Sequence, residues 1–282
     1  MPIKVEDPHP LTDLALARRL ERTEATASAA FVDARAQLEP DVRATWIDVA
    51  GVYAMFDGPE SPLTQTFGLG IFDTTGAPEF ARLEAFFLDR GAPVCHEVCP
   101  LIPQSVLQLL NARGYQPIDF SSVLVRPTAA GPLSRPNAFD VRRVGESEID
   151  LWARVAAAGW ASESAELAAV VEGFGRVIGL ATGAHCFLAF RGGQPIAAAS
   201  LVLNSDVALL AGASTVPEHR QQGAQHALLE ARLGFAAAHG AGLAMMVASP
   251  GSGSQRNAER HGFRVAYTRA KWQLRGGHAA QD

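Results

Sequence analysis

Cysteine, tyrosine and long apolar runs are scarce in this chain. Its 282 residues include three Cys, which cannot form a disulfide framework, and an odd number suits a reducing compartment. No uninterrupted apolar stretch approaches the ~18 residues that cross a bilayer. Residues 1–8 are polar and interrupted by Pro, unlike a signal peptide. We therefore expect a cytoplasmic protein with no membrane partner.

Basic residues are also in deficit. The 24 Lys and Arg residues face 29 Asp and Glu residues, which gives a net charge of −5. Proteins that grip a phosphate backbone usually carry a basic surplus, so we expect no nucleic-acid partner. The hydrophobic fraction of 48% and the charged fraction of 19% are those of a globular protein. The length suits one large domain or two small ones.

The middle of the chain is rich in proline. Three Pro and one Gly within residues 127–138 exclude a helix or a central strand there. The pattern predicts a linker at residues 128–138, with one domain at residues 1–127 and a second at residues 139–276.

The two halves resemble each other. Gly91 in the first half corresponds to Gly240 in the second, an offset of 149, and Gly114 corresponds to Gly262, an offset of 148. Both halves show the order helix, Gly turn, strand, helix, Gly-aromatic pair, strand. An internal repeat of this length indicates two copies of one domain. Unrelated α/β units that share Gly turns are the alternative.

Residue periodicity predicts the secondary structure. Helical spacing covers residues 11–38 (one or two helices), 78–90, 146–160, 162–178, 225–239 and 253–261. Strands are expected at residues 45–55, 64–72, 94–98, 121–126, 140–144, 185–190, 194–203, 207–216, 243–248 and 263–274, the last as two short strands or one bent strand.

A short loop in the second half carries the clearest chemical signal. A β-rich run ends at Val216, a helix begins near Ala224, and Arg220 and Gly223 lie between them. The first N–H groups of a helix attract anions, and a glycine lets the backbone approach a ligand closely. An arginine adds a charge that suits phosphate oxygens. The loop therefore predicts an anion site, although an ordinary helix start has the same pattern.

The residues around this loop resemble a known family. Arg220-Gln221-Gln222-Gly223-Ala224-Gln225 resembles the Q/R-x-x-G-x-G/A pyrophosphate loop of the GNAT acyltransferases. Residues 215–220 resemble that family's V-x-P-E-Y-R run, and residues 257–263 resemble its closing L-Y-E-K-x-G-F segment. The resemblance implies an α/β protein of the α+β type with two tandem GNAT-like domains. Each would hold a mixed, mostly antiparallel twisted sheet flanked by helices.

The resemblance also implies a co-substrate, acetyl-CoA, and no metal. The pyrophosphate would lie on the loop amides, and the pantetheine arm would follow the end of the preceding strand in a splayed gap beside it. A backbone N–H of Thr215 or Val216 would polarise the thioester carbonyl. The expected coenzyme A residues are Ala213, Thr215, Val216, Arg220, Gln221, Gln222, Gly223, Ala224, Gln225, His226 and Asn257.

Two positions depart from the family pattern. Gln225 replaces a small residue, so its side chain must point away from the amides. Ala258 replaces the Tyr that protonates the departing thiolate in many members. A thiol with a pKa near ~8.5 needs little help to leave, so loss of that Tyr is tolerable. Tyr267 and Glu97 remain weak candidates for the catalytic residues, and Trp160 lines the acceptor cleft or caps the core.

Glu97 belongs to the segment Cys95-His96-Glu97-Val98-Cys99. The spacing matches no common zinc pattern. In a half-buried strand, Cys95, Glu97 and Cys99 would share one face, and His96 would point to the other.

The first half differs from the second at the equivalent helix start. Its residues 70–79 contain no Arg. Asp73 or Thr75 is expected to cap the helix, Pro78 suits its first turn, and Glu79 places negative charge where a pyrophosphate would lie. We expect this first domain not to bind coenzyme A.

These patterns favour an acyl-CoA N-acyltransferase. The acceptor would be an amine of a small molecule or peptide, and the protein a monomer or homodimer. Two alternatives are a non-catalytic coenzyme A-binding or sensor module, and a nucleotide or sugar-phosphate site in an unrelated α/β protein.

Overall fold

The computed structural model describes residues 9–129, 139–161 and 164–275, which form two compact units. Unit 1 contains Val125–Met246 and Ala258–Arg264, together with the described residues before Leu11. Unit 2 contains Leu11–Leu124, Val247–Asn257 and the described residues from Val265 onward. Most of the expected linker lies outside the described residues, and the domain boundaries stay a prediction.

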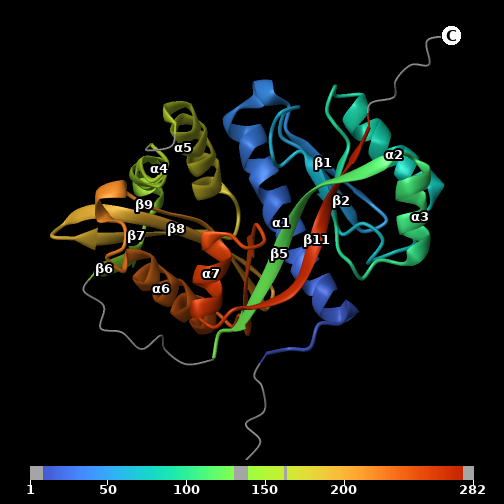
Figure 1. Ribbon diagram of the computed structural model, residues 1–282. Helices are drawn as coiled ribbons and strands as arrows, with labels where there is room; N and C mark the ends of the chain where they lie inside the picture. The colour runs from blue at the N-terminus through green and yellow to red at the C-terminus, as the bar shows by residue number, and fades with distance from the viewer. Residues whose placement is uncertain (1–8, 130–138, 162–163, 276–282) are drawn as a thin grey trace, which may run out of the picture. The chain divides into compact units, whose positions relative to one another are not determined.

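Unit 1 is built on a mostly antiparallel sheet with the strand order β10-β9-β8-β7-β6 (Figure 1). The neighbours from β6 to β9 are antiparallel, and β9 and β10 are parallel. The strands are β6 (Asp140–Arg143), β7 (Ala184–Arg191), β8 (Gln194–Asn204), β9 (Val207–Thr215) and β10 (Leu243–Ala248), the last of which ends in unit 2.

Helices cover both faces of this sheet. Helix α4 (Ile149–Ala158) packs on β8 and β9 with α5 (Ala165–Leu180) beside it, and α6 (Ala224–Ala238) lies on the other face (Figure 1). Trp152 is the largest side chain of the α4 core and is 1% exposed. Short 3-10 helices precede α4 (Glu146–Glu148) and α6 (Pro217–His219).

Strand β9 is irregular where the site forms. Its register with β8 shifts between the pairs Ser200–Ala211 and Ala198–Ser214, which is a β-bulge. Its parallel ladder with β10 runs only from Val207–Leu243 to Leu209–Met245, so the rest of β9 extends beyond the ladder. The end of β9 therefore offers the kind of free edge that the expected splayed gap requires.

The strands of unit 2 are of mixed direction and follow the order β1-β2-β3-β4-β11-β5. Helix α1 (Leu14–Leu38) packs on β1, β2 and β3, and α2 (Ala77–Leu88) packs on β1 and β2. The remaining elements are β1 (Thr45–Val49), β2 (Val52–Phe56), β3 (Gln65–Phe67), β4 (Cys95–Val98), α3 (Gln104–Ala112), β5 (Tyr115–Pro127), α7 (Gly253–Arg260) and β11 (Arg264–Leu274); β5 ends in unit 1, and α7 and β11 each have residues in both units.

Three expectations are refined by unit 2. The range 11–38 contains one helix, Leu14–Leu38, and the range 263–274 contains one strand, Arg264–Leu274. The β-rich run at residues 45–55 is a hairpin, because Ala50 and Gly51 turn with φ of 54° and 78°. The last strand of the second half, β11, pairs with β4 of the first half. Each compact unit therefore uses segments from both halves of the sequence.

Strand β4 is buried on both faces, so the expected half-buried strand is wrong. All four of its residues are buried, because β3 and β11 flank it and side chains cover each face. The expected alternation is correct. His96 lies against Thr66 and Tyr115 on one face, and Glu97 lies against Arg269 on the other.

No helix in the described part of the chain is both long and apolar enough to cross a membrane.

Candidate functional site

The loop between β9 and α6 has the conformation of an anion cradle. Gly223 is the N-cap of α6 with φ of 95°, and Gln221 also has a positive φ of 62°. Helix α6 begins at Ala224, as the sequence predicts. A Cβ on Gly223 would meet Phe139 at 3.7 Å, so conformation rather than crowding requires glycine here.

The start of α6 presents donors without nearby acids. The first intrahelical hydrogen bond runs from the Ala227 N–H to the Gly223 carbonyl at 3.1 Å. The N–H groups of Ala224 and Gln225 precede it and have no partner within the helix. The first turn contains no acidic residue, so the positive end of the helix dipole is not neutralised there.

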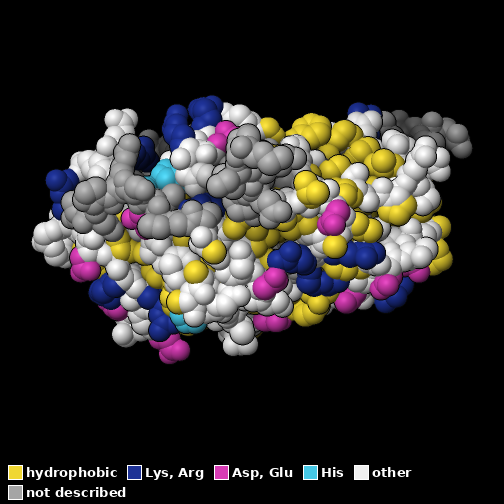
Figure 2. Space-filling view, turned by 90° about the horizontal axis from the view of Figure 1, so that it is seen from below, with side chains coloured by type: hydrophobic (Ala, Val, Ile, Leu, Met, Phe, Trp, Pro, Cys, Tyr) yellow, Lys and Arg dark blue, Asp and Glu magenta, His cyan; other side chains and the backbone are white. Residues whose placement is uncertain are grey.

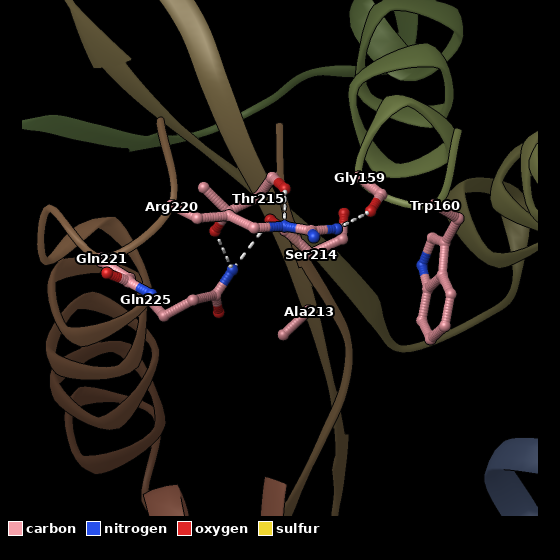
Figure 3. Close-up of a pocket in the computed structure, with 8 residues that line it drawn as sticks. All are labelled: Gly159, Trp160, Ala213, Ser214, Thr215, Arg220, Gln221 and Gln225. Atoms are coloured by element: carbon pink, nitrogen blue, oxygen red, sulfur yellow. Dashed lines mark hydrogen bonds between the residues drawn. The ribbon is translucent and has the colours of Figure 1, made fainter. Parts of the chain in front are cut away.

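Arg220 is tied to backbone carbonyls. Its Nη2 donates to the Gly159 carbonyl at 2.6 Å, and its Nε donates to the Thr215 carbonyl at 3.4 Å. The side chain thereby joins the end of α4 to the end of β9 (Figure 3). A role for Arg220 in phosphate binding stays a prediction.

The side chains of Gln222 and Gln225 are also held by hydrogen bonds. Gln225 Nε2 donates to the Ser214 carbonyl at 2.7 Å and to Thr215 Oγ1 at 2.8 Å, so its side chain lies along β9 (Figure 3). Gln222 donates to the Glu218 carbonyl at 3.2 Å and accepts from Arg191. Gln225 can therefore replace a small residue, because its side chain is held against the strand.

A cavity of about 310 Å³ lies beside this loop (Figure 3). It brings together five of the expected coenzyme A residues and Trp160, and it adds Gly159 and Ser214. Gly159 was missed because its importance is steric: a Cβ there would lie 2.5 Å from the Ser214 Cβ. The five expected residues are Ala213, Thr215, Arg220, Gln221 and Gln225.

One of the two expected carbonyl-polarising groups is already used. The Val216 N–H donates to the Ile196 carbonyl at 3.0 Å, so this N–H is already engaged in the sheet, and a contact of Val216 with coenzyme A stays a prediction. Backbone groups of successive strand residues face opposite edges, so the Thr215 N–H faces away from β8. Thr215 remains the candidate.

Two other expected residues lie apart from the cavity lining. His226 Nδ1 lies 2.9 Å from His261 Nε2, and His226 Nε2 lies 3.7 Å from Glu230 Oε1. Asn257 is on α7 in unit 2. Their contacts with coenzyme A stay predictions.

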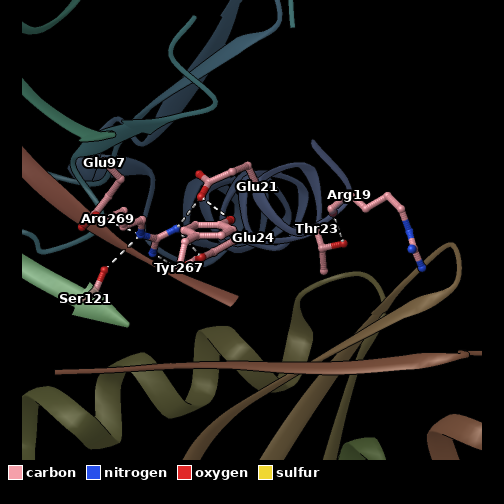
Figure 4. A network of polar contacts seen from close by, with 8 residues as sticks. All are labelled: Arg19, Glu21, Thr23, Glu24, Glu97, Ser121, Tyr267 and Arg269. Carbon is pink, nitrogen blue, oxygen red and sulfur yellow. Dashed lines mark hydrogen bonds and ion pairs between the residues drawn. The ribbon is translucent and has the colours of Figure 1, made fainter. Parts of the chain in front are cut away.

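The catalytic candidates Glu97 and Tyr267 share a buried cluster in unit 2 (Figure 4). The Tyr267 hydroxyl donates to Glu21 Oε1 at 2.8 Å. Arg269, only 2% exposed, donates to both Glu24 oxygens at 2.7 and 2.8 Å, and its Nε lies 2.9 Å from Glu97 Oε2. This arrangement ties both candidates into a charged core network, and their catalytic role stays a prediction.

Burial dominates the titration of this cluster. Loss of hydration raises the pKa of Glu21 and of Glu97, and the nearby Arg269 charge opposes that rise. Burial also raises the pKa of Tyr267 well above its usual value, and the Glu21 carboxylate adds to the effect. Proton release from Tyr267 is therefore strongly disfavoured.

The start of α2 in unit 2 contrasts with the start of α6. Gly76 is the N-cap, and its N–H donates to Glu79 Oε2 at 2.8 Å. Pro78 lies in the first turn, as expected. The expected capping by Asp73 or Thr75 is wrong, because the Thr75 hydroxyl donates instead to the Asp73 carbonyl at 3.3 Å. The Glu79 carboxylate occupies the helix end where an anion would bind.

Within residues 9–129, 139–161 and 164–275, no group of three or more His, Cys, Asp or Glu side chains could hold a metal ion.

The mostly antiparallel sheet, the bulged strand and the glycine-started helix are the features that the GNAT resemblance implies for the fold. Residues 151–263 match the model of the acetyltransferase (GNAT) family. This segment belongs to that family, which confirms the resemblance seen in the sequence. No curated protein matches the chain significantly.

Solved structures share the fold. A GCN5-related N-acetyltransferase from Kribbella flavida is 19% identical with a TM-score of 0.60, over 89% of this chain and 97% of that one. A tandem GNAT protein from the clavulanic acid biosynthesis pathway is 15% identical with a TM-score of 0.57, over 80% and 79%. A GCN5-related N-acetyltransferase from Sphaerobacter thermophilus is 17% identical with a TM-score of 0.53, over 94% and 95%. The expected fold class, with tandem GNAT domains, is confirmed.

Proposed function

We propose that the protein transfers an acetyl or other acyl group from coenzyme A to an amine of a small molecule or peptide. In this reaction the thioester C–S bond breaks, a C–N bond forms, and the amine proton leaves to the thiolate or to solvent. The observation that carries the proposal is the left-handed Gly223 at the acid-free start of α6, beside a cavity at the bulged end of β9.

The residues present suit coenzyme A. The Ala224 and Gln225 amides would receive the pyrophosphate, because helix-start N–H groups bind anions. The edge of β9 near Ala213 and Thr215 would pair with the pantetheine amides. Bound there, coenzyme A supplies the activated acyl group. The Thr215 N–H, which faces away from β8, would polarise the thioester carbonyl.

The first half is proposed to be a scaffold without coenzyme A. At its equivalent helix start, Glu79 already accepts the Gly76 N–H, and its charge would repel a pyrophosphate. Coenzyme A bound to both units would contradict this part of the proposal.

The net charge of the protein is compatible with the proposed amine acceptor. Lys and Arg side chains are mixed with Asp and Glu across the face in Figure 2, as suits a net charge of −5 and a small amine acceptor. A monomer or homodimer in the cytoplasm, with acetyl-CoA as donor, completes the proposal.

The decisive experiment compares two glycines of one helix. Gly223→Val forces a β-branched residue into the left-handed region, so the affinity for coenzyme A should fall about tenfold or more. Gly234→Ala lies inside α6 with open space around its Cβ and should leave the affinity unchanged. Isothermal titration with coenzyme A measures both. Equal affinity in the two variants would refute the assignment of the loop.

A sensor module is the second candidate, because the sequence has Ala258 at the motif position where the resemblance implies the general acid of many family members. Release of free thiol from acetyl-CoA, measured across a panel of amines, separates the two. Amine-dependent release identifies an enzyme. Coenzyme A binding with no release from any amine favours the sensor.

A further inference from the structure

Unit 1 contains a second cavity, of about 330 Å³, between α4, α5 and the bulge of β9. No charged side chain is among the residues that line it, all of which belong to the described part of unit 1. The walls are aromatic and aliphatic side chains, mainly Trp152, Ala156, Trp160, Val171, Phe174 and Ile178.

Trp152, one of the two tryptophans in the wall, uses its polar atom in the sheet. Trp152 Nε1 lies 3.2 Å from the carbonyl oxygens of both Phe187 and Ala199 in the sheet. Its hydrogen-bonding capacity is therefore satisfied by the sheet, and its ring offers carbon atoms to the cavity. A charged occupant would lose its hydration here without gaining a charged partner among these side chains.

The apolar cavity adjoins the cavity at the loop. Trp160 and Ala213 line both. Gly212, in the β9 bulge with φ of 59°, lines the apolar cavity next to Ala213. A thioester held along β9 would thus have its carbonyl end next to the apolar walls.

We infer that the cavity receives an apolar substituent of a substrate, carried next to the amide bond that forms. At about 30 Å³ per water-sized group, the cavity holds a group of roughly ten non-hydrogen atoms, far more than an acetyl methyl. The substituent is an acyl chain longer than acetyl or the aliphatic or aromatic part of the acceptor amine. Polycationic amines do not fit it. This inference rests on the proposed acyl transfer.

The test fills the cavity from α5. Val171→Trp introduces a large ring at a cavity-lining position, and Val170→Trp introduces the same ring at the neighbouring position, which is 53% exposed and outside the lining. One arm varies the acyl chain of acyl-CoA from two to eight carbons with one amine. The other arm varies an n-alkyl or arylalkyl amine with acetyl-CoA. Initial rates of thiol release give kcat/KM for the wild type and both variants.

The expected result is a gain in kcat/KM of about fourfold per added methylene in one arm, until the cavity is full. The arm that shows the gain identifies the source of the apolar group. Val171→Trp should abolish the gain while affinity for free coenzyme A is kept, and Val170→Trp should keep both.

Equal kcat/KM for all chain lengths in both arms, or an unchanged gain in Val171→Trp, would overturn the inference. If the wild-type protein does not bind coenzyme A at all, the proposed function itself is refuted. If no amine is turned over, thermal shifts with the same acyl-CoA and amine series give the same comparison.

Discussion

His96 shows how a single polar residue is held neutral inside unit 2. Tyr115 OH donates to Glu84 Oε1 at 3.1 Å, so its oxygen is left to accept the Nε2 proton of His96 at 3.1 Å. Nδ1 then accepts from Thr66 Oγ1 at 2.8 Å. Because the ring is 0% exposed, loss of hydration lowers the pKa of His96 to about 3.

This lowered pKa predicts acid sensitivity. Between pH ~6.5 and 3 the unfolded chain binds a proton at His96 that the folded chain does not. The free energy of unfolding therefore decreases as the pH falls through that window. The full effect is of order 5 kcal/mol. Urea unfolding from pH 7 to pH 4 should show a steeper loss in the wild type than in His96→Gln. Nitrogen-15 NMR should show His96 neutral, with its proton on Nε2, at pH 5; an imidazolium signal there would contradict the prediction.

At the scale of elements, the end of α4 and the end of β9 form one joint. Ser214 Oγ donates to the Ala156 carbonyl at 2.8 Å, and Arg220 donates to the Gly159 carbonyl. Gly159 fits because it has no side chain, since a Cβ would come within 3.2 Å of the Thr215 nitrogen. The joint sets the width of the cavity beside the loop.

Gly159→Ala should therefore separate the two elements. Overpacking of this kind costs about 1–3 kcal/mol and should also weaken coenzyme A binding severalfold. Gly173→Ala is the control, because it lies in helix α5 with open space around its Cβ and should stabilise by about 0.5–1 kcal/mol. Chemical denaturation and calorimetric titration measure both effects. A Gly159→Ala variant with wild-type stability would contradict this prediction, because it would show that the ends of α4 and β9 can move apart at no cost.

Sequence patterns predicted the elements well because these depend on local periodicity. The start of α6 at Ala224 and the place of Pro78 in the first turn of α2 followed from neighbouring residues alone. The contacts of Gly159 and the cluster around Arg269 did not, because they join residues far apart in the chain. The sequence also does not give the partners of a side chain. It predicted that Gln225 points away from the amides, but only the structure shows that Gln225 donates to Ser214 and Thr215.

At the scale of the whole molecule, the sequence halves and the compact units do not coincide. Strand β11 lies mainly in unit 2, paired with β4, although it follows the GNAT segment of the second half. It supplies Arg269 and Tyr267 to Glu21 on α1. Without β11, β4 loses one of its neighbouring strands. Glu21 would then stay buried without the Arg269 charge that offsets its burial.

A fragment of residues 1–138 should therefore fail to fold alone. Breaking a buried ion pair costs about 3–5 kcal/mol, a large share of a domain's stability. Amide NMR spectra should show poor dispersion for the fragment, and co-expression with residues 139–282 should restore a folded complex. A well-dispersed spectrum for the isolated fragment would show that unit 2 does not depend on β11.

The position of β11 also bears on the order of events during synthesis. Domains near the start of a chain usually fold while the ribosome is still making the rest. Here the sheet of unit 2 needs residues up to Leu274, so α1 must wait until β11 has emerged. In the interval, Glu21 and Glu24 on α1 lack the Arg269 cation that β11 later brings.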